Sequence, residues 1–190
     1  MIKAVIFDCF GVLTTDGWRQ IREEYFADDA QLMQQALDLD KAVNAGMLEY
    51  DDFLKGISNL SGLPAAEVQG RLGKSVPNKL LFDYIKSNLK PHFKIGLLSN
   101  AADDWLDELF EPRQRELLDD AVLSYATGLV KPDPAMYHLA ASRLEVTPEE
   151  CIFIDDIERY CVAAGEVGMH SVWHTDSPQT IRRIEEIIHA

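Results

Sequence analysis

Several polar side chains follow directly after short apolar runs of the sequence. The apolar runs are 2–7, 93–98 and 151–154, and a weaker run at 121–124 precedes the loop 128–134 (GLVKPDP). The polar residues at these ends are Asp8, Ser99, Asn100, Lys131, Asp155 and Asp156. This set suits phosphoryl transfer, in which a carboxylate attacks phosphorus, cations neutralise the phosphate charge, and hydroxyl and amide groups hold its oxygens.

Asp8 is the candidate nucleophile, and the acids offer a site for a hard cation. Mg²⁺ prefers oxygen ligands and usually takes only one or two carboxylates, which Asp8 and the pair Asp155-Asp156 could supply. No cluster of histidine or cysteine offers a softer metal site. The residues therefore point to magnesium as the cofactor.

A parallel sheet would bring these residues together, because ligands bind outside the carboxyl ends of its strands. The apolar runs, together with 170–173, are nearly continuous rather than alternating, which is typical of strands covered on both faces. Helical patterns separate the later runs, with start signals at Asp133-Pro134 and Ser177-Pro178 and a capping box at 147–150. These features predict an α/β fold.

Residues 17 to about 90 contain no strand-like run and show successive helical stripes instead. Gly46, Gly56, Gly62, Gly73 and Pro77 divide this stretch into short helices. We therefore expect a helical insertion within the α/β core. Trp18, with Arg19 and Arg22, opens the insertion and could face a substrate.

Composition narrows the class of protein. The 47% hydrophobic and 26% charged residues are typical of a globular protein, and no apolar run approaches the ~18–20 residues of a membrane span. The net charge of −14 disfavours binding to nucleic acid and to anionic membranes. The first residues do not have the layout of a signal peptide, so we expect a cytoplasmic protein. Cys9, Cys151 and Cys161 lack CxxC spacing and are expected to be buried, reduced thiols.

Four segments in this order resemble the motifs of the haloacid dehalogenase-like hydrolase superfamily, in the subclass with a helical cap after the first motif. They are VIFDCFGVL (5–13), LLSNA (97–101), GLVKPDPAMY (128–137) and CIFIDDIERYCVAAGEVGM (151–169). The resemblance covers 1–16 and 93–173, and the helical stretch only by position and helical character. It implies a Rossmann-like parallel-sheet core domain (1–16 and 91–190) with an inserted α-helical cap domain (17–90).

The resemblance also implies roles for individual residues. Asp8 would attack phosphorus to form an aspartyl-phosphate, while Ser99 and Lys131 bind the phosphoryl group and Asn100 supports them. A magnesium ion would be held by Asp8, by the backbone carbonyl at Phe10 and by Asp156. Asp155 would orient water or the metal's surroundings.

Phe10 departs from the family pattern. The family's phosphatases normally carry an aspartate there, which protonates the leaving group and later activates water. Phenylalanine can do neither, and a positioned acid–base group contributes ~10²–10⁴-fold to the rate. The backbone carbonyl of Phe10 is unaffected, so the metal site is expected to remain. Val12 and Tyr160 also stand where threonine and an Asn or Asp are usual.

Three functions fit the sequence, and the first is favoured. It is a Mg²⁺-dependent phosphatase of a small phosphorylated metabolite, with low efficiency because of Phe10. The second is a phosphate-binding or regulatory protein that does not hydrolyse its ligand. The third is a haloacid dehalogenase, which the aromatic Phe10 and the spacing of Lys131 and Tyr137 would suit. Asp155-Asp156 argues against it, because two negative charges would repel a carboxylate substrate. The substrate and the oligomeric state are left open.

Overall fold

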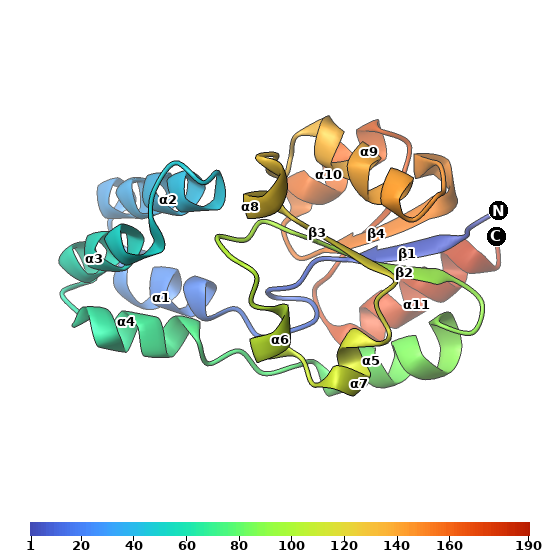
Figure 1. Cartoon of the computed structure of the whole chain (residues 1–190), viewed down its shortest axis with the longest axis horizontal. Coiled ribbons are helices and arrows are strands. Elements are labelled where there is room, and N and C mark those ends of the chain that lie inside the picture. The colour runs from blue at the N-terminus through green and yellow to red at the C-terminus, as the bar shows by residue number, and fades with distance from the viewer.

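The computed structural model describes all residues, 1–190, as an α/β core joined to a group of helices (Figure 1). The sheet has five parallel strands in the order β3-β2-β1-β4-β5. The strands are β1 (Ala4–Phe7), β2 (Lys94–Ser99), β3 (Asp120–Leu123), β4 (Cys151–Asp155) and β5 (His170–Trp173). The predicted α/β class and parallel sheet are therefore confirmed.

Helices surround this sheet and form the separate group. They are α1 (Gly17–Tyr25), α2 (Ala30–Asn44), α3 (Tyr50–Ser61), α4 (Ala65–Leu72), α5 (Lys79–Tyr84), the π-helical turn η1 (Ile85–Leu89), α6 (Leu106–Leu109), α7 (Pro112–Arg115), α8 (Ser124–Thr127), α9 (Pro134–Arg143), the 3₁₀ turn η2 (Pro148–Glu150), α10 (Glu158–Glu166) and α11 (Ser177–Ile188). None of them combines the length and apolarity needed to cross a membrane.

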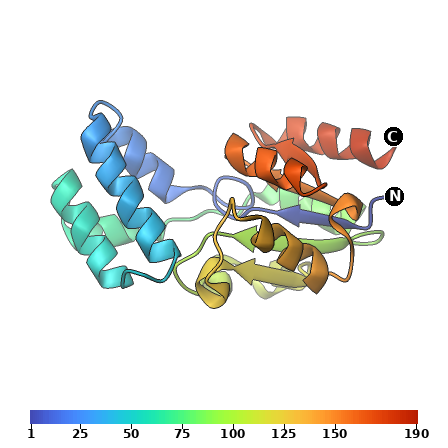
Figure 2. The ribbon, with the colours of Figure 1, turned by 90° about the horizontal axis from the view of Figure 1, so that it is seen from above.

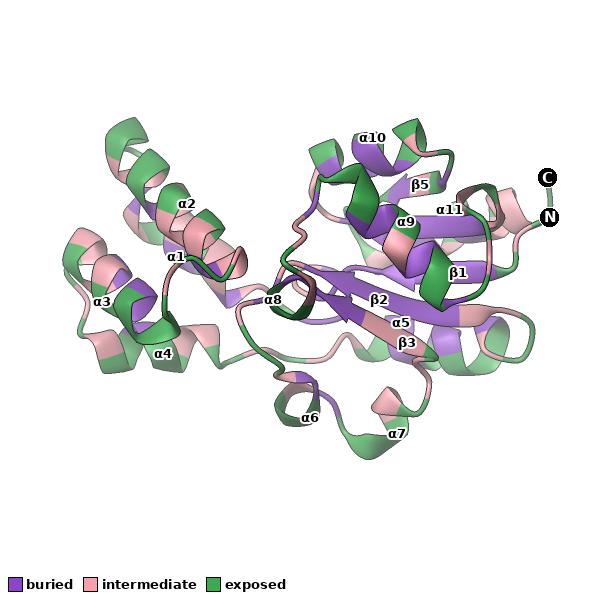
Figure 3. Ribbon diagram, turned by 45° about the horizontal axis from the view of Figure 1, so that its top comes forward, coloured by how far each residue is buried: buried purple, intermediate pink, exposed green.

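The central strands of the sheet are buried on both faces, and Figure 3 shows β1 and most of β2 in the colour of buried residues. Alternate residues of β1 illustrate this, because Val5 and Phe7 pack with α5, η1 and α11, while Ala4 and Ile6 pack with α9 and α10. Such a strand has no solvent face, which explains its continuous apolar sequence. All three cysteines are buried and free, and Cys9 and Cys151 belong to these two clusters.

Local signals set the ends of several helices. The Asp133 side chain accepts a hydrogen bond from the backbone N–H of Ala135 at the start of α9 (2.9 Å), and both bonds of the capping box at 147–150 are present. At α11 the capping side chain is Asp176, one residue before the predicted Ser177-Pro178 signal. Ser177 is instead the first residue of the helix.

Helices α1–α4, here called the helical group, pack around a core of their own (Figure 2). That core consists of Ile21, Phe26, Ala36, Val43, Phe53, Leu54, Ile57 and Val68. Two adjacent segments connect the group to the sheet, and they bond to each other through Thr15 N–H to the Val76 carbonyl (3.0 Å) and Asn78 N–H to the Leu13 carbonyl (2.7 Å).

The last part of the predicted insertion behaves differently from the rest. Leu81, Phe82, Ile85 and Leu89 belong to the apolar cluster under the sheet, not to the core of the helical group. The stripe of apolar residues in 79–89 predicts a buried helix face, but it does not specify which surface covers that face. The division into two domains, with its boundaries, stays a prediction.

Candidate active site

The register of the sheet places the ends of three strands at one level. Phe7 pairs with Leu97 of β2 and with Ile154 of β4, so the next residues, Asp8 and Asp155, emerge at the same edge. The Asp8 backbone N–H donates to the Ile154 carbonyl (2.8 Å). Ser99 ends β2 at this edge as well. Residues distant in sequence therefore meet where a parallel sheet binds its ligands.

Lys131 joins the first and fourth strands through a buried pair of ion contacts. Its Nζ lies 2.7 Å from Asp8 Oδ1 and 2.6 Å from Asp155 Oδ2. The three side chains are almost inaccessible, since Lys131 is 1%, Asp8 9% and Asp155 0% exposed. Asp155 Oδ1 additionally accepts the backbone N–H of Ile157 (2.8 Å). A buried charge is tolerated only when it is paired in this way.

Burial and the opposite charge of the ion-pair partner shift the pKa of Asp8, and likewise that of Lys131, in opposite directions. Burial raises the pKa of Asp8 to about 7, against the lowering effect of the Lys131 ammonium, and the nearby Asp155 raises it further. Burial disfavours the charge on Lys131, but Asp155 and Asp8 outweigh it and hold the pKa of the ammonium well above its usual range. A second cation near Asp8 would favour its ionised, nucleophilic form.

Asn100 positions Lys131 through the backbone. Its Oδ1 accepts the Lys131 backbone N–H (2.7 Å), and its Nδ2 donates to the Lys131 carbonyl (3.2 Å). Ser99 is 1% exposed, and its Oγ bonds only the Asn100 carbonyl, at 3.3 Å. Asn100 therefore uses its amide to hold the lysine, whereas the Ser99 hydroxyl lines the cavity with a weak intramolecular bond.

Three carboxylates offer the oxygens that a divalent cation needs. Ligand atoms of Asp8, Asp155 and Asp156 all lie within 4.8 Å of one another. Asp156 Oδ2 is buried and accepts no hydrogen bond, although Arg19 Nη2 contacts it as an ion-pair partner. Gly11 has φ +86°, and a Cβ there would lie 2.7 Å from Asp156 Cγ. The donor set fits Mg²⁺, and the Arg19 guanidinium is the only partner of this oxygen.

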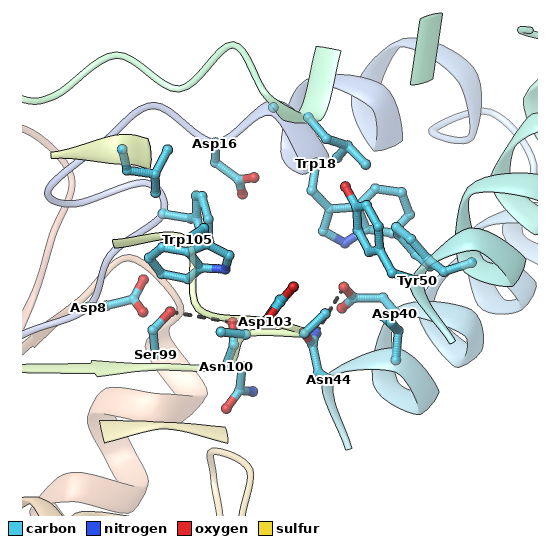
Figure 4. Close-up of a pocket in the computed structure, with 18 of the residues that line it drawn as sticks. Asp8, Asp16, Trp18, Asp40, Asn44, Tyr50, Ser99, Asn100, Asp103 and Trp105 are labelled. Atoms are coloured by element: carbon cyan, nitrogen blue, oxygen red, sulfur yellow. Dashed lines mark hydrogen bonds between the residues drawn. The ribbon is translucent and has the colours of Figure 1, made fainter. Parts of the chain in front are cut away.

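Phe10 lies against an aromatic neighbour instead of offering an acid. Its ring packs edge-on to Trp105, with centroids 4.7 Å apart. Both rings line the same cavity as Asp8, Ser99 and Lys131. Figure 4 shows Trp105 beside Asp8 and Ser99. Next to the nucleophile candidate, the wall is therefore apolar.

The cavity has a volume of about 410 Å³ and extends from the strand ends to the helical group. Asp40, Asn44 and Tyr50 line its far side, opposite Asp8 (Figure 4). Burial raises the pKa of Asp40 to about 6, although Arg22 and a hydrogen bond from Asn44 Nδ2 (3.0 Å) both lower it. A volume of this size accommodates a small organic molecule.

The sequence-predicted residues are brought together. Those that line this single cavity are Asp8, Phe10, Ser99, Asn100, Lys131 and Asp156, and Asp155 lies directly beneath it in the Lys131 cluster. Trp18 and Arg22, expected as candidates to face a substrate, also line it. Tyr137 does not, since it is fully buried against Phe153 and its hydroxyl donates to the Tyr160 carbonyl (3.1 Å).

Sequence reasoning missed other contacts at the site. Trp173, which ends β5, donates its indole N–H to the Asp156 carbonyl (3.0 Å) although the side chain is exposed. Ser124 Oγ bonds the Asn44 carbonyl (2.8 Å) and thereby links α2 to the core. No local pattern marks either residue, because both act on a segment far away in the chain.

Family comparison agrees with this architecture. Residues 2–168 match the model of the haloacid dehalogenase-like hydrolases. The chain belongs to this family of hydrolases.

Individual relatives include phosphatases and a dehalogenase. The sesquiterpene phosphatase AstK of Aspergillus oryzae is 25% identical, with 98% of this chain and 96% of that protein aligned. The (S)-2-haloacid dehalogenase 1 of a Pseudomonas strain is 27% identical over 90% of this chain and 83% of its own. A Bacteroides thetaiotaomicron family enzyme, solved with magnesium and inorganic phosphate, superimposes with a TM-score of 0.69 at 24% identity, over 91% and 94% of the two chains.

Other curated relatives are much longer proteins. Mouse acyl-CoA dehydrogenase family member 10 is 34% identical over 82 residues, which is 43% of this chain but 8% of that protein. A segment similar to part of this chain thus also occurs within a much larger protein.

Proposed function

We propose that this hydrolase is a Mg²⁺-dependent phosphatase of a small phosphorylated metabolite, acting through an aspartyl-phosphate on Asp8. The observation that carries the proposal is the cluster of Asp8, Lys131, Asp155 and Asp156 at the end of a 410 Å³ cavity. The phosphatase relatives and the magnesium and phosphate bound by the Bacteroides enzyme support it. A cytoplasmic location stays a prediction.

Each residue has a distinct part in this proposal. Asp8 supplies the attacking oxygen, held at the end of a buried strand by its own backbone bond. Lys131 neutralises charge on the transferring group, and the Ser99 hydroxyl donates to one of its oxygens. Asn100 acts through Lys131, whose backbone it holds on both sides.

Magnesium would be held by Asp8, Asp156 and the Phe10 carbonyl. When bound, it would neutralise phosphate charge and favour the ionised form of Asp8. Asp155 is already occupied by Lys131 and the Ile157 N–H, so it suits a supporting part better than direct coordination. Asp156 Oδ2 accepts no hydrogen bond and has only the Arg19 guanidinium as a partner, so it suits direct coordination.

The dehalogenase alternative is disfavoured by the same cavity. A 2-haloacid carries a carboxylate, but Asp156 faces the cavity without a hydrogen bond, and Tyr137 is withdrawn into the core. A phosphate-binding protein without hydrolysis is the stronger second candidate. Phe10 favours it, because the wall beside Asp8 holds no proton donor.

A panel of phosphate monoesters assayed with and without Mg²⁺ tests the proposal. We expect release of inorganic phosphate that requires Mg²⁺ and is abolished by Asp8→Asn, with the melting temperature of the variant showing that it remains folded. The native protein should also become phosphorylated on Asp8, which intact-protein mass spectrometry would detect. Activity retained in Asp8→Asn would refute the mechanism. Binding of Mg²⁺ and phosphate without any turnover would favour the second candidate.

A further inference from the structure

We propose that the substrates of this site are aryl phosphates, in which a phenolic oxygen is bonded to phosphorus. This inference rests on the proposed phosphatase function and specifies its substrate class. It follows from two features of the cavity: no carboxylic acid that could protonate a leaving group stands beside Asp8, and aromatic rings line the walls.

The immediate surroundings of Asp8 hold no free acid. Phe10 and Trp105 form the apolar wall next to it, with ring centroids 4.7 Å apart. The Lys131 ammonium is bound by Asp8 at 2.7 Å and by Asp155 at 2.6 Å. The Tyr160 hydroxyl also lines the cavity, where it accepts hydrogen bonds from Asn100 Nδ2 and Arg159 Nη2. A leaving group at this position therefore meets no carboxylic acid that could protonate it, and we infer that it departs as an anion.

The remaining carboxyl groups of the cavity are committed elsewhere. Asp16 caps α1 by accepting the Arg19 N–H at 3.0 Å, and it faces the guanidinium groups of Arg19 and Arg22 at 3.9 Å, so it acts as an acceptor. Asp40 is bonded to Asn44 on the opposite side of the cavity from Asp8 (Figure 4). The other acids are the metal-ligand candidate Asp156 and the exposed Asp103, Asp104 and Glu108.

Anionic departure selects for a weakly basic leaving oxygen. A phenolate is the conjugate base of a group with pKa ≈ 10, whereas an alkoxide is far more basic and needs a proton during bond cleavage. In the proposed step, an Asp8 oxygen bonds to phosphorus, the bond from phosphorus to the phenolic oxygen breaks, and the phenolate leaves with the electron pair. Water then hydrolyses the aspartyl-phosphate to phosphate, and the proton it releases goes to the phenolate in solution.

The cavity also fits an aromatic body. Trp18 and Phe53 meet edge-on with centroids 5.7 Å apart, and Tyr50 stacks on Phe53 at 6.0 Å. With Phe10 and Trp105 near Asp8, aromatic rings therefore stand at both ends of the cavity. Ring pairs in such arrangements add to the free energy of simple burial.

Charge excludes a second acidic group on the substrate. The cavity is lined by seven carboxyl residues and by three cationic residues, of which Lys131 is already paired. The carboxyl residues are Asp8, Asp16, Asp40, Asp103, Asp104, Glu108 and Asp156, and the cationic ones are Arg22, Lys131 and Arg159. A neutral or cationic aromatic body is thus favoured over one with a carboxylate or a second phosphate.

The decisive experiment compares phenyl phosphate with benzyl phosphate under Mg²⁺. The two esters share a ring but differ greatly in the basicity of the leaving oxygen, and kcat/KM reports on formation of the aspartyl-phosphate. We expect the native protein to prefer phenyl phosphate by roughly 10²-fold or more, and substituted phenyl phosphates to react more slowly as the leaving phenolate becomes more basic.

Substitutions at Phe10 test whether the missing acid causes the preference for phenyl phosphate. Phe10→Asp should reduce the preference for phenyl phosphate by ~10²–10⁴-fold, mainly by accelerating benzyl phosphate. Asparagine has nearly the same shape as aspartate but cannot supply the proton, so Phe10→Asn should keep the native preference for phenyl phosphate. Melting temperatures of both variants establish that they are folded. Trp105→Leu should raise KM for phenyl phosphate without changing the dependence on leaving-group basicity.

The outcomes distinguish this inference from the function on which it rests. Similar kcat/KM for the two esters in the native protein would overturn the inference and leave the phosphatase function standing. Hydrolysis by Phe10→Asp alone would also overturn it, because the native wall would then be incompatible with turnover. Failure of native protein and both Phe10 variants on every ester would overturn the function and the inference together.

Discussion

The two ends of the cavity differ in how completely their polar groups are paired. At the strand ends, Lys131, Asp8 and Asp155 are at most 9% exposed and bond one another. On the helical group, two buried nitrogen atoms, Trp18 Nε1 and Arg22 Nε, have no hydrogen-bond partner. Trp18 Nε1 lies near Asp40 but does not form a hydrogen bond with it. The Lys131 cluster at the strand ends is thus fully paired in the folded chain, whereas the helical side has polar groups that a ligand can pair.

This difference follows from how the two ends are built. The strand-end residues follow directly from a five-stranded sheet whose register fixes their positions. The helical group contacts the core through a few bonds, such as Ser124 Oγ to the Asn44 carbonyl. We therefore expect changes at the strand ends to affect stability strongly and changes on the helical side to affect it moderately.

The largest effect on stability is expected from Lys131→Met. The variant leaves Asp8 and Asp155 buried without a cation, and removal of one partner from a buried ion cluster costs ~3–5 kcal/mol. Urea unfolding at pH 8 without Mg²⁺ measures the change. As a control, Lys79→Met breaks an exposed pair with Asp83 and should change the free energy of unfolding by less than about 1 kcal/mol. Equal effects of the two substitutions would contradict the buried cluster.

Substitutions of Asp155 and of Asp156 should weaken Mg²⁺ binding to different extents. Asp156→Asn removes the candidate direct ligand, whose only other partner is Arg19, and is expected to weaken Mg²⁺ binding by ~10²-fold or more, about 2.7 kcal/mol at RT ≈ 0.59 kcal/mol. Asp155→Asn should weaken Mg²⁺ binding less and lower stability more, because its partners are Lys131 and the Ile157 N–H. Calorimetry measures the affinities. The reverse order would show that Asp155 is the direct ligand.

On the helical side, Asp40 should make stability depend on pH. Its folded-state pKa is raised to about 6 from a usual 3.8, so the native state binds more protons than the unfolded state between these values. The free energy of unfolding therefore falls as pH rises from about 4 to 6. Asp40→Asn removes this loss and should be more stable than the native protein at pH 8 by on the order of 2 kcal/mol.

The neighbouring Asp38 provides the control for this experiment. It lies on the same helix, is exposed and accepts a hydrogen bond from Gln34. Asp38→Asn should change stability by less than about 0.5 kcal/mol at any pH. A pH profile unaltered by Asp40→Asn would mean that another group causes the dependence.

The smallest of these effects is expected where the helical group meets the core. Ser124→Ala removes the bond to the Asn44 carbonyl and leaves the Ala101 N–H without its partner, which is 2.9 Å away. Loss of such bonds costs about 1 kcal/mol, with more for a group left unpaired. Thermal unfolding measures this loss, and limited proteolysis should show faster cleavage in the segments that connect α2 to α3. A loss as large as that of Lys131→Met would contradict the contrast between the two ends.

The residues of the strand ends could be found in the sequence because each stands next to a continuous apolar run. Asp8, Ser99 and Asp155 follow such runs within one residue, and a parallel sheet aligns those ends by its hydrogen bonding alone. The strands, the α/β class and the start of α9 were predictable for the same local reason. Phe10 could likewise be identified as the position without an acid.

Only the tertiary structure decided which distant side chains meet. The stripe at 79–89 packs under the sheet instead of with α1–α4, and Phe10 packs on Trp105, 95 positions away in the printed sequence. The contacts of Asp156 with Arg19 and with the Trp173 indole also join residues that are distant in the sequence. Periodicity fixes which face of a segment is buried, but shape and volume in the packed core determine what covers that face. The unpaired polar wall opposite Asp8 arises from this packing and has no signature in the sequence.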